Sequence, residues 1–266
     1  MELNKQAIIE CITKIADDAL IIGHRNSEWV GIGPTLEEDI AFASIAQDKI
    51  GQALQLYTVL HEHCGIAKPD HYAFLREEPE YRCCHFVELP MHEYDTALVR
   101  HFLFDTAESL RYAALAESTF EPLALLAKKF RGEIKYHTLH ANVWIEQLAK
   151  GNEESKARIQ TALNECVPMA LGIFEESLYE EHLISSGIFI GEEVLQKTWL
   201  ESIAATIRTV GLVLPSLEEQ SSLSPNLYRS VVNSAIGGRR GYHTEHLQPL
   251  LDEMSEVLRT DPDAVW

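Results

Sequence analysis

Residues 5–22 read KQAIIECITKIADDALII, and this stretch already favours a helix over a strand. Its apolar side chains recur at helical spacing, at Ile8, Cys11, Ile12, Ile15, Ala19 and Ile22. We therefore expect a helix that begins after Asn4, as the N-cap residue, and stops at Gly23. Long helices with such an apolar stripe are buried best against other helices, as in a bundle.

The same spacing predicts six further helical stretches. They cover residues 35–64, 95–118, 122–150, 153–185, 192–210 and 245–259. Thr35 and Glu38 have the spacing of a capping box, and Gly65 is expected to end the helix that they start. Pro168 predicts a kink or break in the stretch 153–185, because proline removes a backbone donor. Residues 65–90 contain three prolines and are expected to form an irregular connection with one short helix.

No Asn-Gly or Asp-Gly turn joins alternating apolar runs, so nothing indicates a sheet. We predict an all-α fold of the helical-bundle type, a single domain over residues 1–266. With 46% hydrophobic and 24% charged residues, the composition is that of an ordinary globular protein.

The charge and the cysteines exclude several classes of protein. A formal net charge of −19 would repel a phosphate backbone, so nucleic acid is not an expected partner. The chain has no 18-residue apolar run and no secretory signal, which predicts a cytoplasmic protein without a membrane span. Five irregularly spaced cysteines predict free thiols in a reducing compartment.

Acidic side chains fall on the apolar faces of three predicted helices. These are Asp48, the pair Asp105 and Glu108, and Glu133 with His137. A ferritin-type di-iron bundle needs a carboxylate from each of two helices and a Glu-x-x-His pair from each of the other two. Asp105-x-x-Glu108 lacks the histidine, and Glu133 and His137 are four residues apart rather than three. The sequence therefore favours a degenerate interior polar cluster with no metal, and an unusual metal site is the alternative.

Other groups of ionisable residues invite a metal or ligand interpretation. Structural zinc is an alternative for the region around residues 61–92, which contains His61, His63, Cys64, Cys83, Cys84, His85 and His92. Adjacent cysteines chelate poorly and no Cys-x-x-Cys pair occurs, which argues against zinc. His243 and His246 are expected to cap and pack the last helix, with an acid/base pair as the alternative. Arg239 and Arg240 are candidates for contacting coenzyme A.

Two long motifs carry a resemblance to a known family. The first comprises residues 25–31, RNSEWVG, and residues 34–53, PTLEEDIAFASIAQDKIGQA; the second comprises residues 241–254, GYHTEHLQPLLDEM. These motifs, with the terminal Trp266, resemble the PaaC family of phenylacetyl-CoA epoxidase components, and the similarity extends over essentially the whole chain. The departures are Ser44, Glu108 and Gly172, where the family or a related member has Asn, His and an acid.

The resemblance implies a ferritin-like fold with extra helices and a place in a multicomponent cytoplasmic monooxygenase. That enzyme converts phenylacetyl-CoA to its ring 1,2-epoxide with oxygen and electrons from NADPH. A sister subunit holds the di-iron site, and a separate reductase holds flavin and an iron-sulfur cluster. The PaaC component is then a structural, non-catalytic partner of the catalytic subunit, in a homo- or hetero-oligomer, with no catalytic residues and no cofactor in this chain. The alternative is an independent ferritin-like di-metal protein with an unusual ligand set.

Overall fold

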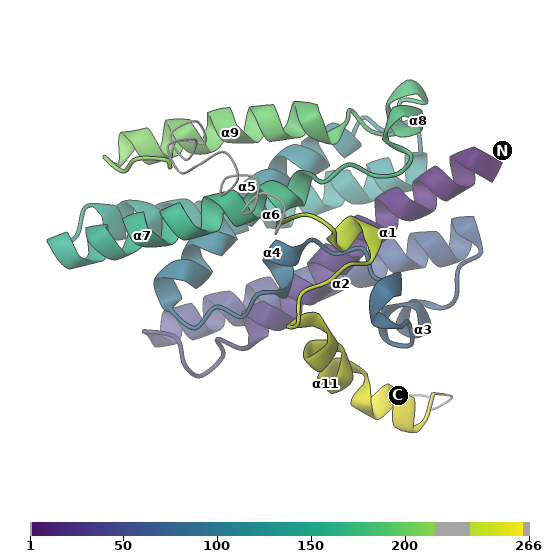
Figure 1. Ribbon diagram of the computed structural model, residues 1–266, viewed down its shortest axis with the longest axis horizontal. Coiled ribbons are helices and arrows are strands. Elements are labelled where there is room, and N and C mark those ends of the chain that lie inside the picture. The colour runs from purple at the N-terminus through teal and green to yellow at the C-terminus, as the bar shows by residue number, and fades with distance from the viewer. Residues whose placement is uncertain (1, 216–234, 263–266) are drawn as a thin grey trace. The chain divides into compact units, whose positions relative to one another are not determined.

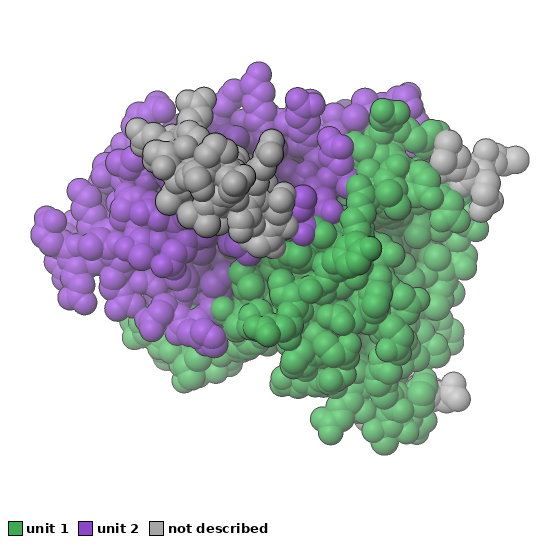
Figure 2. Space-filling model, in the orientation of Figure 1, with its two compact units in different colours: residues 1–90, 177–183, 237–266 green, residues 91–176, 184–236 purple. Residues whose placement is uncertain are grey.

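The computed structural model describes residues 2–215 and 235–262, and every regular element in these ranges is a helix. The prediction of an all-α fold is confirmed for this part of the chain. The chain divides into two compact units (Figure 2). Unit 1 comprises Met1–Pro90, Ser177–Leu183 and Gly237–Trp266, and unit 2 comprises Met91–Glu176 and Ile184–Ile236. That residues 1–266 form one domain stays a prediction.

Unit 1 is built on two long helices, α1 (Glu2–Ser27) and α2 (Leu36–Cys64), which lie side by side in antiparallel order (Figure 1). The predicted stop at Gly23 is wrong, and Asn4 lies inside α1 rather than at its cap. A Cβ atom on Gly23 would lie 2.9 Å from Ile50 Cγ1 and 3.3 Å from the Ala46 carbonyl oxygen. The glycine therefore allows the two helices to approach closely and does not end the first one.

The ends of α2 agree only in part with the sequence prediction. Gly65 takes the left-handed conformation at the C-terminal end, with φ of 66°, and its N–H bonds to Leu60 O. Thr35 is the N-cap residue, but its side chain makes no capping hydrogen bond, so the predicted capping box is wrong. Asp39 instead accepts a hydrogen bond from the backbone N–H of Gly33, at 2.8 Å.

Short elements complete unit 1. They are α3 (Pro69–Phe74), the 3-10 turn η1 (Glu78–Glu80), α4 (His85–Glu88), the start of α8 (Glu180–Ser185), η4 (Gly238–Arg240) and α11 (Leu247–Thr260). The region expected to hold one short helix thus holds three short elements, and the last helix begins two residues later than predicted. Because most of these elements are too short to be stable alone, they depend on side-chain contacts within unit 1.

The central helix of unit 2 is α5 (Tyr94–Leu115). It packs against α6 (Glu121–Ala149), α7 (Glu153–Ala170) and α9 (Glu192–Thr209) (Figure 1). A tight loop joins α5 to α6, and Pro122 lies in the first turn of α6 as predicted. The fully buried Trp199 donates its indole N–H to the Leu103 carbonyl oxygen, at 2.9 Å. This hydrogen bond anchors α9 on α5.

The break predicted at Pro168 comes two residues later, where α7 gives way to the 3-10 turn η2 (Leu171–Phe174). Pro168 itself lies in the last turn of α7. This turn has no room for a side chain at position 172, because a Cβ atom on Gly172 would lie 1.9 Å from the Ala235 carbonyl oxygen. Within the described residues, no helix is both long enough and apolar enough to cross a membrane.

Candidate functional site

The five residues of the predicted polar cluster do not all fall in one unit. Asp48 lies half-buried on α2 in unit 1. Asp105 and Glu108 are buried on α5, and His137 is buried on α6, all in unit 2. Glu133 is half-buried on α6.

The α5–α6 contact brings Asp105 together with imidazole rings. Asp105 is fully buried and contacts His101 Nδ1, one turn earlier on α5. His137 Nδ1 lies 3.8 Å from the other oxygen of Asp105. The ring of His140 has its centroid 5.4 Å from that of His101, and the His137 ring lies at 6.2 Å. Two imidazoles, those of His101 and His137, therefore lie beside the Asp105 carboxylate, and the His140 ring lies next to His101.

Sequence reasoning missed His101 and His140 and counted a single usable histidine here. Both could have been found, since His101 precedes Asp105 by four residues and His140 follows His137 by three, spacings that share a helix face. Burial lowers the pKa of His101 more than the Asp105 carboxylate raises it, so the ring is favoured as neutral imidazole.

The donor set of unit 2 fits a ferritin-type di-iron site poorly. Such a site is dominated by carboxylates that bridge and flank two metal ions. In the described part of unit 2, the Asp105 carboxylate is already in contact with His101, and Glu108 lies 3.5 Å from the Tyr112 hydroxyl one turn further along α5. Imidazoles outnumber carboxylates around Asp105, which is the reverse of the ferritin arrangement.

Two adjacent acids of α1, Asp17 and Asp18, hold the short elements of unit 1 in place. Arg76 donates to both oxygens of Asp17, at 2.6 and 3.0 Å, and the Tyr57 hydroxyl donates to the same carboxylate at 2.6 Å. The rings of Tyr72 and Tyr81 lie 4.2 and 4.1 Å from the Arg76 guanidinium carbon. This network fixes the segment that leads from α3 to η1.

Asp18 binds Arg239 through two hydrogen bonds of 2.8 and 2.7 Å, and accepts a third from the backbone N–H of Cys84. Arg239 is 2% exposed and also donates to the carbonyl oxygens of Lys14 and Arg82. Its guanidinium is thus committed inside unit 1, which removes Arg239 as a coenzyme A contact.

A third group in unit 1 combines Cys83, Glu88 and His243, whose potential ligand atoms all lie within 4.8 Å of one another. His243 Nδ1 lies 2.8 Å from Glu88 Oε1, and the Cys83 sulfur lies 3.6 Å from the same oxygen and 3.9 Å from that nitrogen. The other oxygen of Glu88 accepts hydrogen bonds from the amide and hydroxyl of Thr244, at 2.8 and 2.7 Å.

The surroundings set the protonation of this group. Burial alone would raise the pKa of Glu88, but hydrogen bonds from His243 and Thr244 outweigh it and lower that pKa. Burial and the neighbouring Glu88 carboxylate raise the pKa of the Cys83 thiol well above its ordinary value. His243, expected to cap and pack the start of the last helix, bonds to Glu88 of α4.

Within the described residues, the other side chains of the zinc alternative do not join this group. His61 bonds to the Ile66 carbonyl oxygen and His85 to the Tyr242 carbonyl oxygen, at 2.7 and 2.6 Å. All five cysteines are buried free thiols, as predicted. His246 is the N-cap residue of α11, but its side chain makes no capping hydrogen bond.

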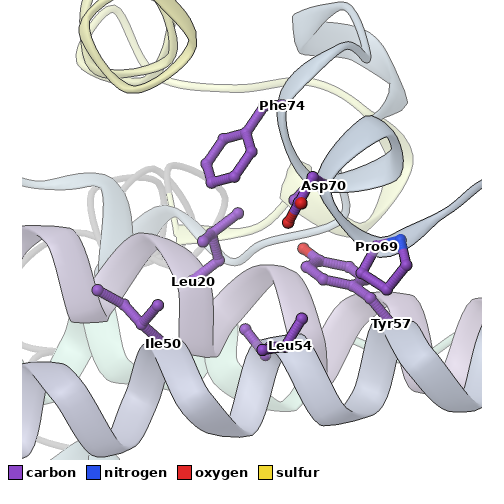
Figure 3. A pocket seen from close by; sticks show the side chains of 9 residues that line it. Leu20, Ile50, Leu54, Tyr57, Pro69, Asp70 and Phe74 are labelled. Carbon is purple, nitrogen blue, oxygen red and sulfur yellow. The ribbon is translucent and has the colours of Figure 1, made fainter. Parts of the chain in front are cut away.

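A small pocket of unit 1 lies between α1, α2 and α3 (Figure 3). Its wall is mainly apolar, with Leu20, Ile50, Leu54 and Phe74 facing the hollow and Asp70 at its rim. The cavity measures about 100 Å³. Pockets for drug-sized ligands usually measure about 300–1,000 Å³, so a coenzyme A thioester does not fit here.

Helices packed in antiparallel pairs, with ionisable side chains buried between α5 and α6, define an all-α protein of the helical-bundle class. The family model described as "Phenylacetic acid catabolic protein" matches residues 1–266, and the chain belongs to this family. The chain is 30% identical, over 253 residues, to the C component of 1,2-phenylacetyl-CoA epoxidase from Escherichia coli (strain K12). That similarity covers 95% of this chain and 96% of the relative, and confirms the resemblance seen in the sequence.

Proposed function

We propose that this chain is a non-catalytic subunit of a cytoplasmic phenylacetyl-CoA 1,2-epoxidase, and that it pairs with the di-iron subunit that performs the reaction. Similarity to the C component of such an epoxidase along 95% of the chain is the observation that carries the proposal. On this proposal, the di-iron centre belongs to the partner, and the flavin and iron-sulfur cluster belong to the reductase. This chain stabilises the catalytic subunit and supplies no redox cofactor.

The donor chemistry of α5 and α6 supports a role outside catalysis. A ferritin-type di-iron centre is built mainly from carboxylates, whereas Asp105 has the imidazoles of His101 and His137 beside it and is in contact with the first. The buried cluster is better suited to link α5 to α6 through charge-assisted contacts than to hold two metal ions.

An exposed apolar face on α6 supports a protein partner. Leu125, Tyr136, Leu139 and Val143 are 59%, 71%, 57% and 41% exposed, and their spacing places them on one side of the helix. Large apolar side chains gathered on one exposed face are typical of surfaces that bind another protein.

Reconstitution of the epoxidase with and without this chain tests the proposal. We expect phenylacetyl-CoA-dependent NADPH oxidation to fall at least about tenfold without the chain, because the catalytic subunit loses the packing that holds its bundle. The iron-binding residues of the catalytic subunit are unchanged in this experiment. Full turnover by the remaining subunits alone would contradict the proposal.

The second candidate is an independent di-metal protein, favoured by the imidazoles of His101 and His137 beside Asp105 and of His140 beside His101. His140 is half-buried, so a His140→Gln variant of this chain is the matched probe. In the reconstituted complex we expect the variant to support turnover within about twofold of the unsubstituted chain. Iron bound to the isolated chain, with an oxo-bridge absorption band that His140→Gln abolishes, would instead support the second candidate.

A further inference from the structure

Cys83, Glu88 and His243 bring three different kinds of metal-binding atom to one buried point of unit 1. Cys83 and Glu88 are both 0% exposed, and the side chain of His243 is fully buried. Glu88 is the last residue of α4, and Cys83 lies just before that helix. His243 lies between η4 and α11, 160 residues further along the chain than Cys83.

Both ring nitrogens of His243 face oxygen atoms that accept hydrogen bonds. Nδ1 lies 2.8 Å from Glu88 Oε1, and Nε2 lies 3.2 Å from the Tyr81 carbonyl oxygen. A neutral imidazole carries a single N–H, so it satisfies only one of these two acceptors. An imidazole nitrogen and a carboxylate oxygen are both zinc ligands, so an ion in place of the proton between Nδ1 and Oε1 would join the same two side chains.

The separations of the three atoms resemble one face of a zinc tetrahedron. Zinc binds sulfur at about 2.3 Å and nitrogen or oxygen at about 2.0–2.2 Å, so the edges of its tetrahedron are about 3.4–3.6 Å. The observed sulfur–oxygen, sulfur–nitrogen and nitrogen–oxygen separations are 3.6, 3.9 and 2.8 Å. Shifts of a few tenths of an ångström in each side chain would place the three atoms around one ion.

We propose that Cys83, Glu88 and His243 bind one zinc ion, with a water molecule in the fourth position. Thiolate and carboxylate together carry two negative charges, so the ion leaves the buried site neutral. Zinc displaces to solvent both the thiol proton of Cys83 and the proton between His243 Nδ1 and Glu88. Zinc has no redox chemistry, and the site serves to tie the segment before α11 to α4.

The neighbours of the three residues have the arrangement usual around a bound zinc ion. Histidine ligands commonly donate the second ring N–H to a backbone carbonyl, as His243 Nε2 does to Tyr81. Ligand carboxylates are themselves hydrogen-bonded, as Glu88 Oε2 is by Thr244. The site goes beyond the proposed function, and it departs from the expectation that this chain holds no metal at all.

Elemental analysis of the purified full-length chain, grown with zinc and freed of any affinity tag, tests the site. We expect about one zinc ion per chain, falling below about one tenth in Cys83→Ser. Cys84→Ser is the matched control and should keep the ion, because Cys84 is equally buried but lies outside the group. Cobalt in place of zinc should give a thiolate-to-metal absorption band in the control that Cys83→Ser lacks.

A second variant covers the case in which Cys83→Ser does not fold. Thr244→Val keeps all three ligands but removes the hydroxyl hydrogen bond to Glu88, and should weaken zinc binding about 10- to 100-fold. The proposal is overturned if the unsubstituted chain binds neither zinc nor cobalt, which would make the group a closed imidazolium–carboxylate pair. Zinc content unchanged in a folded Cys83→Ser variant would overturn it equally.

Discussion

Gly238 lies where no side chain fits, because a Cβ atom added to it would lie 2.1 Å from the Cys83 carbonyl oxygen. The substitution Gly238→Ala must push two backbone segments apart, and we expect it to lower the free energy of unfolding by about 1–3 kcal/mol. Gly51→Ala is the control in α2, where nothing lies within 4 Å of the added atom. There we expect a gain of about 0.5–1 kcal/mol. Urea unfolding of the two variants measures both effects.

His24 makes the stability of unit 1 depend on pH. Burial lowers the pKa of His24 below its ordinary value of 6.5, more than the nearby Glu253 and Glu28 raise it. The unfolded chain therefore binds a proton more readily, so the stabilisation is complete above about pH 6.5 and is lost as the pH falls towards the folded-state pKa.

Thermal unfolding between pH 7.5 and 5.5 checks this prediction. The melting temperature of the unsubstituted chain should fall more steeply with decreasing pH than that of His24→Gln, at most by the equivalent of about 1.4 kcal/mol per pH unit. Parallel curves for the two proteins would contradict the assigned role of His24.

Side-chain spacing reveals some of the buried ionisable residues. His101 and Asp105, or His137 and His140, share a face of one helix and can be found from their intervals alone. The partnership of Glu88 with His243 has no such signal, because 155 residues separate them. Asp105 is buried because α6 packs beside α5, and the sequence of α5 does not specify where α6 lies.

At the scale of elements, a buried ion pair joins α9 to α5. Arg111 donates to Glu192 at 2.8 Å and to the Ile173 carbonyl oxygen at 3.2 Å, and both charged side chains are at most 2% exposed. Replacement of Glu192 by Ala removes the carboxylate that balances the charge of the buried Arg111 guanidinium. We expect the free energy of unfolding to fall by about 3–5 kcal/mol.

The exposed pair of Glu146, on α6, and Lys150, the residue that caps the end of α6, is the control for this prediction. The two charged groups lie 2.5 Å apart, closer than in the buried pair, but their side chains are 58% and 55% exposed. Water already screens such a pair, so Glu146→Ala should cost less than about 1 kcal/mol. Denaturant unfolding of both variants measures the two losses in free energy of unfolding. Equal losses would show that burial does not make the Arg111–Glu192 pair more important to stability.

The apolar face of α6 carries a prediction about assembly. On the proposed function, Leu139→Glu places a charge where the catalytic subunit binds, and should weaken association at least about tenfold with little change in melting temperature. Ala157→Glu introduces the same charge at an exposed position of α7 and should leave association unchanged. Analytical ultracentrifugation of the mixed subunits measures both, and identical affinities would exclude this face.

At the scale of the whole molecule, acidic residues dominate the charge. The formal net charge is −19 and the isoelectric point lies near 5.0. Mutual repulsion keeps such chains apart at neutral pH, and it vanishes as the net charge approaches zero. We expect light scattering of the isolated chain to rise sharply as the pH approaches 5. A chain that stays monomeric and clear at that pH would contradict this expectation.

The sequence by itself determined the helical class and most of the long helices, because the apolar residues on the buried face of a helix recur every three to four positions. Its boundaries were less secure: Gly23 looks like a stop, but it serves the close approach of α2. Only the tertiary structure decided the attachment of the short elements to Asp17 and Asp18, and the meeting of Cys83 with Glu88 and His243. Such contacts join segments far apart in the chain, and the spacing of residues within one helix does not show which distant residue each of them will contact.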